Sequence, residues 1–321
     1  MRLALFRPCW ITILLLALTI PLAGQSINPA TKPQVAPMTA QEKKNLDFVM
    51  NWWREVLYAG HLELARKYQA ENYIQHNPNA NTGRTGFIEY FTRLGRKPMN
   101  PIPNAMPADQ RPVVAGAKGD YVWLIFEHAD KDPRQPANTY HYNSFDVLRL
   151  QNGQVQEHWD SAQKMPGTGA VGSGVSPRPP MQWNTGRLSR DEEKTLAMAT
   201  EELKDMLQYG HLELADKTMD PGYIQHNPNV PQGRDGFKQF MARVSGRAPR
   251  DIKAEWVNAP VLTLINGPYA FMMWERTAKD PDDPNREYTW NHFDVVRTEN
   301  NLIREHWDEA RINPPAAAGA R

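Results

Sequence analysis

The heptapeptide YIQHNPN occurs twice in this chain of 321 residues, first at Tyr73 and again at Tyr223. The two copies are 150 positions apart. This period is too long for a solenoid, in which repeats run roughly 20 to 50 residues. A chain of this size holds about two domains at roughly 100 to 200 residues each. The repeat therefore predicts a tandem duplication, with one copy of the motif in each of two domains.

Other strings recur in the same order. GHLELA occupies 60–65 and returns at 210–215. GRTGF returns as GRDGF, FDVLR returns as FDVVR, and EHWD is repeated without change. The early strings are 150 positions apart, as in His61 and His211, and the late ones 148, as in His158 and His306. The two copies thus differ by a net deletion of two residues between their first and last motifs.

Each copy begins with helical periodicity and ends with β-rich runs. Apolar residues recur at helical spacing from position 46 and again over 196–207, and a further helical stretch follows each GRxGF glycine. Strands are predicted at 121–128, 140–150 and 154–160, and at 269–276, 288–297 and 302–308. Three helices followed by a mainly antiparallel sheet predict an α+β fold for each unit.

The N-terminus resembles a secretory signal, with a basic start, an apolar run at 10–20 and small residues near position 24. The apolar run is short for a bilayer span of about 20 residues, so we expect export to the periplasm or the medium. Membrane attachment would require an uncleaved signal. We predict a signal peptide at 1–24, a Pro- and Ala-rich tether at 25–40, a first domain at 41–164, a Gly- and Pro-rich linker at 165–189, a second domain at 190–312 and a tail at 313–321.

Composition excludes several functions. The net charge of +1 gives no field that would attract nucleic acid. The one cysteine, Cys9, lies in the predicted signal, so the mature chain would have no disulfide, thiol nucleophile or thiolate ligand. There is no HExxH motif and no close histidine pair on a helix, and we predict neither a metal site nor a cofactor. The VGSGVS string lies in the linker, which excludes a nucleophile elbow.

The EHWD motif carries the clearest chemistry. Alternation along a strand puts His158 and Asp160 on one face, and His306 and Asp308 likewise in the second unit. An imidazole and a carboxylate on one face can act as an acid/base pair if that face lines a cavity. The alternative is a buried polar network that only fixes the sheet.

The partners of this pair depend on the hairpin register. A three-residue loop at 151–153 would pair Asp146 with His158 and Ser144 with Asp160. The same loop in the second unit would pair Asp294 with His306 and His292 with Asp308. A two-residue Asn-Gly turn would instead pair Val147 with His158 and Phe145 with Asp160. We favour the three-residue loop because it gathers the polar residues on one face.

The YIQHNPN string contains a polar trio that follows an aromatic and an apolar residue, Tyr73 and Ile74. This combination indicates a segment that turns toward the protein interior. Gln75, His76 and Asn77 all donate and accept hydrogen bonds. The simpler interpretation is a loop that satisfies its own backbone. We expect the trio to face the HxD pair across one pocket.

YIQHNP, GRxGF, FDVxR and EHWD together resemble the SnoaL-like polyketide cyclase group of the NTF2-like superfamily. The resemblance covers both units, roughly 46–161 and 196–310, and implies two tandem cone-shaped α+β barrels, each with an apolar pocket. In the family's cyclases an aspartate acts as general acid/base without a cofactor, which implies this role for Asp160 and Asp308 beside His158 and His306. It also implies a pocket lined by Gln75, His76, Asn77, Ser144, Asp146, Gln225, His226, Asn227, His292 and Asp294.

The family commonly pairs through its sheets, so the two units are expected to form a pseudo-dimer within one chain. We expect acid/base chemistry, such as aldol cyclisation, isomerisation or a related lyase reaction, on a small apolar carbonyl-bearing molecule. The alternative is a protein that binds such a molecule in the same pockets without reaction. His292, opposite Asp308, makes the second unit the better candidate for catalysis.

Overall fold

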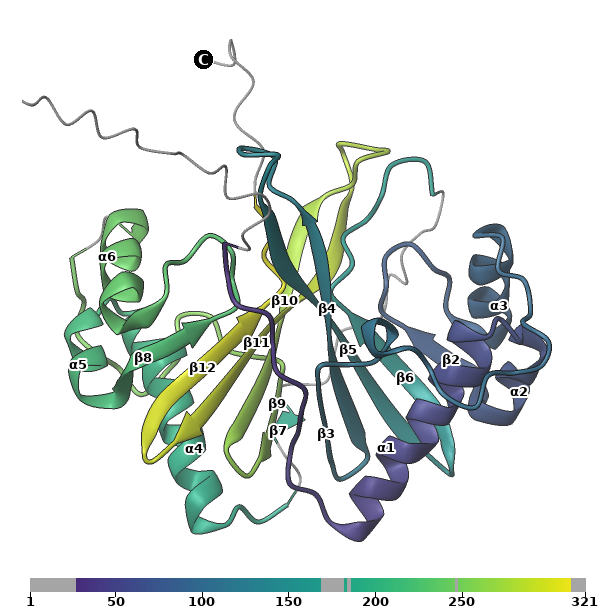
Figure 1. The fold of residues 1–321 in the computed structure, drawn as a ribbon, viewed down its shortest axis with the longest axis horizontal. Helices are drawn as coiled ribbons and strands as arrows, with labels where there is room; N and C mark the ends of the chain where they lie inside the picture. Colours follow the sequence, from purple (N-terminus) through teal and green to yellow (C-terminus); the bar gives the residue numbers. More distant parts are fainter. Residues whose placement is uncertain (1–26, 169–181, 184–185, 246–247, 313–321) are drawn as a thin grey trace, which may run out of the picture.

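The computed structural model describes residues 27–168, 182–183, 186–245 and 248–312. The predicted signal peptide at 1–24, the tail at 313–321 and residues 169–181 of the predicted linker lie outside this part of the chain. Figure 1 shows the first unit, in purple to teal, beside the second, in green to yellow. Within the described ranges, no helix combines the length and the apolar character needed to span a membrane.

Three helices build the outer side of the first unit. α1 (Ala40–Trp52) begins at Thr39, whose hydroxyl accepts from the Glu42 N–H while the Glu42 carboxylate accepts from the Thr39 N–H, a capping box. It continues into a wider π-helical turn, Trp53–Tyr58. After a 3-10 turn at Leu62–Leu64 come α2 (Ala65–Tyr68) and α3 (Gly83–Arg93).

The described strands of the first unit form a six-stranded sheet in the order β1-β3-β4-β5-β6-β2. The pairs among β3, β4, β5 and β6 are antiparallel, and the two outer strands β1 and β2 add in parallel. A 3-10 turn at Ala108–Gln110 precedes β3. The strands are β1 (Gln34–Val35), β2 (Gln69–Gln75), β3 (Val114–Lys118), β4 (Tyr121–Lys131), β5 (Thr139–Gln151) and β6 (Gln154–Asp160).

The second unit repeats this arrangement, with its described strands in the order β7-β9-β10-β11-β12-β8. Its helical elements are α4 (Arg190–Thr200), a π-helical turn (Glu201–Met206), a 3-10 turn (Leu212–Leu214), α5 (Ala215–Thr218) and α6 (Gly233–Ser245). Its strands are β7 (Gln182–Trp183), β8 (Met219–Gln225), β9 (Leu262–Asn266), β10 (Tyr269–Lys279), β11 (Glu287–Glu299) and β12 (Leu302–Asp308). The predicted α+β class, with helices against a curved sheet in each unit, is confirmed.

The β5–β6 hairpin turns differently from the favoured prediction. Gln151 pairs with Gln154 across the two-residue turn Asn152 and Gly153, whose φ angles are 51° and 73°. The second hairpin has the same turn at 300–301, with φ of 52° and 57°. Two successive residues with positive φ match the twist of the flanking strands. The prediction of a three-residue loop was therefore wrong.

A bulge after Arg149 then shifts the pairing by one further residue, so that Leu148 pairs with His158 and Asp146 with Asp160. Neither predicted register is found, because neither included this bulge. The shift from the favoured register is two residues, however, and a shift of two leaves every side chain on its predicted face. The pairs Ser144–Asp160, Asp294–His306 and His292–Asp308 were wrong for the same reason.

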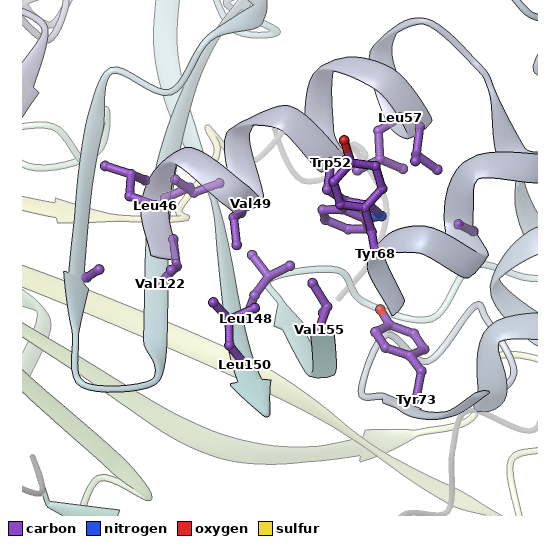
Figure 2. Packing of buried hydrophobic residues seen from close by; sticks show 14 of the residues in the cluster. Leu46, Val49, Trp52, Leu57, Tyr68, Tyr73, Val122, Leu148, Leu150 and Val155 are labelled. Atoms are coloured by element: carbon purple, nitrogen blue, oxygen red, sulfur yellow. The ribbon is translucent and has the colours of Figure 1, made fainter. Parts of the chain in front are cut away.

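The helices of each unit cover one face of its sheet. In Figure 2, Leu46 and Val49 of α1 lie over Val122 and Leu148 of the sheet, with Trp52 at the far end of the helix. These five side chains are at most 7% exposed, and burying an aliphatic side chain of this kind stabilises the fold by about 1.5–3 kcal/mol. The second unit has a corresponding core of α4, α5, α6 and its own sheet.

The opposite faces of the two sheets pack against each other at the centre of the molecule (Figure 1). The ring of Phe145 stacks on that of Phe293, with centroids 5.4 Å apart and planes 5° apart. Trp123 donates from Nε1 to Oδ1 of Asn266 at 2.8 Å. The remaining buried residues of this shared core include Ile125, Val147, Trp159, Leu264, Phe271, Val295 and Trp307.

Residues 27–39, predicted as a tether, are packed across both units. Asn28 and Thr31 are buried, and the Thr31 hydroxyl lies 3.1 Å from Nδ1 of His226 and accepts from Nε1 of Trp307 at 3.1 Å. The stretch predicted as a tether is therefore held in place by contacts over residues 27–39. Composition indicated the absence of a helix, but it could not show that polar groups of a distant unit would bind the segment.

Candidate functional site

His158 on β6 is the centre of a polar cluster in the first unit. Its Nε2 lies 2.8 Å from Oδ1 of Asp146 on β5, and its Nδ1 lies 3.0 Å from Oε1 of Gln75 on β2. β2 and β5 flank β6 in the sheet. Gln75 is thus a neighbour of the HxD pair on the adjoining strand. The expectation that it faces the pair across a pocket was wrong, because YIQ begins the segment as a strand and not as a loop.

The contacts of Gln75 determine the protonation of His158. The Gln75 amide donates from Nε2 to the Tyr73 hydroxyl at 3.0 Å, and its Oε1 accepts from the Asn77 N–H at 3.0 Å. Oε1 is therefore an acceptor, so Nδ1 of His158 donates to it, and Nε2 donates to the Asp146 carboxylate. Burial opposes the charge on His158, but Asp146 outweighs it and raises the pKa of this imidazole.

Asp160 has a different environment from Asp146. Its Oδ2 accepts from Nδ2 of Asn77 at 2.7 Å, and its Oδ1 accepts from the Ala162 N–H at 3.0 Å. Burial raises the pKa of Asp160; the imidazolium of His158 opposes this effect and the negative Asp146 adds to it. Asp160 is thus a carboxyl group that keeps its proton to a higher pH than an ordinary aspartate, while two donors fix its oxygens.

A cavity of about 210 Å³ opens onto this cluster. Asp146, His158 and Asp160 form part of its wall, and α1, the π-helical turn after it and α3 form most of the rest. Tyr90 of α3 has its hydroxyl pKa raised by burial, with the negative Asp160 adding to the shift. The other lining residues are Trp52, Trp53, Leu57, Tyr58, Gln75, Asn77, Phe87, Phe91, Arg96 and Gln110.

His76 and its counterpart His226 were expected to line the pockets, and both lie on the other face of their sheets. The His76 ring stacks on Trp159, with centroids 4.7 Å apart, and its Nε2 lies 2.8 Å from Oε1 of Glu157. Alternation along β6 places Glu157 and Trp159 opposite His158. His226 makes the same contacts with Glu305 and Trp307. Each of these two histidines thus stacks on a tryptophan of the core that the two sheets share.

The second-unit cluster contains a carboxylate that the first lacks. His306 lies 3.0 Å from Asp294 through Nε2 and 2.8 Å from Oε1 of Glu202 through Nδ1. The Tyr223 hydroxyl donates to the same Glu202 oxygen at 2.9 Å. Burial opposes the charge on His306, but Glu202 and Asp294 hold its pKa well above the ordinary value. Gln225 keeps its contacts with Tyr223 and with the Asn227 N–H.

His292 is held in the same way. Its Nε2 lies 3.1 Å from Oδ2 of Asp294, and its Nδ1 lies 2.5 Å from Oε1 of Glu309. Burial opposes its charge, but Asp294 and Glu309 raise the pKa of His292 well above the usual value. Asp308 accepts from Asn227 and from the Ala310 N–H, both at 2.9 Å, and burial raises its pKa. The imidazoles of His292 and His306 are thus each held between two carboxylates.

Sequence reasoning missed Glu202, Glu309 and Tyr90. Glu202 corresponds to Trp52 at the offset of 150, in a helical stretch whose two copies differ in sequence. The available signal was a carboxylate on the apolar face of a predicted helix. Glu309 follows directly after the repeated EHWD motif and corresponds to Ser161 at the offset of 148. Ser144, expected in the pocket, does not line this cavity; it bonds to His128 at 2.8 Å and lines a larger cleft outside the cavity.

Among the residues that the structure describes, two groups have the residue types and spacing to hold a metal ion: Asp146 with His158 and Asp160, and Asp294 with His306 and Asp308. In each group one ligand atom from every residue lies within 4.8 Å of the others. Both ring nitrogens of His158 already face acceptors, so a cation would have to displace the hydrogen bond to Asp146.

Comparison with known families concerns the second unit. Residues 200–306 match the family model described as a SnoaL-like domain. The match covers the cluster around His306, and it does not include the first unit. The NTF2-like fold predicted from the motifs is thus supported in the second unit by sequence, and in the first by the repeated element order. No curated protein matches the chain in sequence.

Solved structures with a similar fold each align with little more than one third of this chain. TsrD from Streptomyces laurentii is 17% identical, with 38% of this chain and 90% of that chain covered and a TM-score of 0.24. An NTF2-like protein of unknown function from Burkholderia pseudomallei is 16% identical, with 39% and 93% covered and a TM-score of 0.27. A candidate polyketide cyclase from Acidithiobacillus ferrooxidans is 20% identical, with 38% and 89% covered and a TM-score of 0.25.

Proposed function

We propose that the protein is an acid/base enzyme that needs no cofactor and acts on a small, mainly apolar, carbonyl-bearing molecule, with Asp160 as general acid/base. The observation that carries the proposal is the position of Asp160, a half-buried carboxyl group with a raised pKa on the wall of a largely aromatic cavity. Perturbed carboxyl groups in cavities are typical of proton-transfer sites.

The surroundings of Asp160 suit removal of a proton next to a carbonyl group. Its charged form is fixed by Asn77 and the Ala162 N–H, so the base is oriented before the substrate binds. The imidazolium of His158, already bonded on both nitrogens, acts through its charge, which would favour the negative charge that develops on an enolate. Tyr90 also lines the cavity, and its hydroxyl is a candidate donor to the enolate oxygen. Aldol cyclisation and isomerisation both begin with this step.

The first unit is the better candidate, contrary to the expectation from sequence. In the second unit, Glu202 and Glu309 bond to the two imidazoles, and Phe240 stands at the position of Tyr90 at the offset of 150. Phe240 therefore lacks the hydroxyl group that Tyr90 offers, and Glu309 holds His292 in place. We infer that the second unit has a supporting role.

The alternative is a binding protein that holds the same molecule without reaction. The aromatic walls of the cavity, Trp52, Trp53, Phe87 and Phe91, favour this function as much as catalysis. In that case Asp160 and Asn77 would serve as hydrogen-bond anchors for the ligand.

The first step of the test is to identify the bound substrate or ligand. Mass spectrometry of the small molecules that the denatured protein releases would do so. Asp160→Asn should lower turnover of that molecule or its close analogues by about a hundredfold or more, with affinity retained. Asp308→Asn, the matched change in the second unit, should leave turnover within about threefold, since Asp308 lies outside the 210 Å³ cavity. If Asp160→Asn turns over as fast as the unaltered protein, Asp160 is not the acid/base. Ligand binding without turnover in the unaltered protein would favour the alternative.

We also propose export, which the basic and apolar N-terminal segment supports. The expected product of expression in the native host is a mature chain that begins near residue 25, and N-terminal sequencing of the exported fraction would show it. A full-length chain in the membrane fraction would instead indicate an uncleaved anchor.

A further inference from the structure

A larger cleft of about 900 Å³ lies between the two units, outside the inner cavity of the first. Tyr90, Asp146 and Asp160 line both the cleft and the inner cavity. A molecule that reaches Asp160 from the cleft can therefore extend back into it. The inner cavity is the smaller of the two and takes only part of a long molecule.

The second unit provides the far wall of this cleft. Trp290 on β11, together with Glu309 and Arg311 just after β12, lines it opposite the first-unit residues. The two walls are also joined directly, because Asn143 donates to the carbonyl oxygen of Asp308, and Asn291 to that of Asp160, both at 3.2 Å. The amide of Asn291 thus helps to position the backbone of the residue proposed as acid/base.

The charges in the cleft are unevenly compensated. Asp146 is bonded to His158, and Glu309 to His292. The guanidinium of Arg311 lies 4.1 Å from the centre of the Tyr142 ring and, among the described residues, makes no ion pair within 4.0 Å of a carboxylate. Arg311 is exposed and keeps its donors available, and a guanidinium binds an anionic oxygen pair through two parallel hydrogen bonds.

We infer that the two units form one composite site that takes an elongated molecule with an apolar reacting end and an anionic far end. The reacting end enters the first-unit cavity at Asp160, and a carboxylate or similar group binds Arg311 of the second unit while the middle packs beside Trp290. This inference rests on the proposed function for the position of the reacting end. The anionic subsite itself depends only on the cleft and on Arg311.

The chain provides a matched substitution for the test. Gln163 corresponds to Arg311 at the offset of 148 and lines the same cleft. Arg311→Gln therefore places in the second unit the residue that the first unit has at this position. Adding Gln163→Arg to the same chain restores one positive charge to the cleft, now on the first-unit wall. Arg66→Gln, on the exposed end of α2, is the control for loss of a positive charge.

Two fluorescent probes with the same aromatic skeleton separate charge from apolar contact: anilinonaphthalene sulfonate, which is anionic, and neutral N-phenylnaphthylamine. Arg311→Gln should weaken the sulfonate by about tenfold or more and leave the neutral probe within about twofold. Gln163→Arg in the same chain should restore much of the sulfonate affinity. Arg66→Gln should change neither probe.

The inference is overturned if the unaltered protein shows no saturable sulfonate binding, if Arg311→Gln weakens both probes alike, or if it weakens neither. Asp160→Asn distinguishes this result from failure of the proposed function. If Asp160→Asn keeps turnover while Arg311→Gln still discriminates between the probes, the anionic subsite stands and the acid/base role of Asp160 does not.

Discussion

The shared core between the sheets should couple the stability of the two units, and the stacked pair Phe145 and Phe293 offers the sharpest test. Both rings are fully buried, and each comes from a different unit. Their centroids are 5.4 Å apart and their planes nearly parallel, and Phe271 lies against both. Substituting either ring removes contacts that belong to both units at once.

The expected size follows from burial and ring contact. Phe→Ala at a fully buried site lowers the free energy of unfolding by about 3–5 kcal/mol, a large part of the roughly 5–15 kcal/mol that stabilises a native protein. A stacked aromatic pair contributes about 0.5–1.5 kcal/mol beyond its buried area. Phe145→Leu and Phe293→Leu keep most of the apolar volume, so a double variant with both changes should still fold.

The measurement is urea denaturation of the two leucine variants and their combination. The double variant should be more stable than the sum of the single effects predicts, by about 0.5–1.5 kcal/mol, because the stack is lost only once. The control pair is Phe145→Leu with Phe237→Leu, since Phe237 is buried in the second unit's own core. That pair should be additive within about 0.3–0.5 kcal/mol.

Amide exchange adds a local readout. Phe293→Ala should increase exchange in β5 of the first unit, although the substitution lies in the second. Additive behaviour of Phe145 and Phe293, or unchanged protection of β5 in Phe293→Ala, would show that the units are stable independently and that the shared core does not couple them.

Two further predictions concern titration and the N-terminal segment. Because burial holds the pKa of Asp160 above the ordinary value, the folded state keeps a proton that the unfolded chain has lost. Stability relative to the D160N variant should therefore fall as pH rises from about 4, and calorimetry of both proteins from pH 4 to 8 should show it, whereas a difference independent of pH would contradict the raised pKa. Thr31→Val keeps the shape of the side chain but removes the acceptor for Trp307 and the contact with His226. It should lower the free energy of unfolding by about 1–3 kcal/mol in urea denaturation, with Thr289→Val, at an exposed position of β11, as control, and an unchanged midpoint would mean that residues 27–39 do not stabilise the fold.

Much of the fold followed from local patterns. The repeated strings predicted two units of one fold, and the change from helical to alternating periodicity predicted α+β architecture in each. The faces of the HxD residues were also predictable, because alternation along a strand depends only on sequence spacing. The same rule, applied from the correct strand, would have placed His76 and Trp159 together on the far face.

Register and remote contacts were not predictable in this way. The Asn152–Gly153 turn and the bulge after Arg149 each shifted the pairing by one residue, and the preference between such backbone conformations is set by sheet twist and packing. Glu202 entered the second-unit cluster because the π-helical turn after α4 packs over β12, which brings residues 104 positions apart to hydrogen-bond distance. No local signal gives the partner of a buried carboxylate.

The sequence by itself determined the duplicated α+β units and the face of each sheet that carries the HxD pair, because spacing along one helix or strand is a property of that segment alone. Tertiary structure decided that an aromatic-walled cavity opens onto the HxD pair of the first unit, that His76 and His226 stack on tryptophans of the core shared by the units, and that Arg311 lies across a cleft from Asp160. Those outcomes depend on how two sheets pack face to face, and that packing is determined by the fit of side chains far apart in the chain.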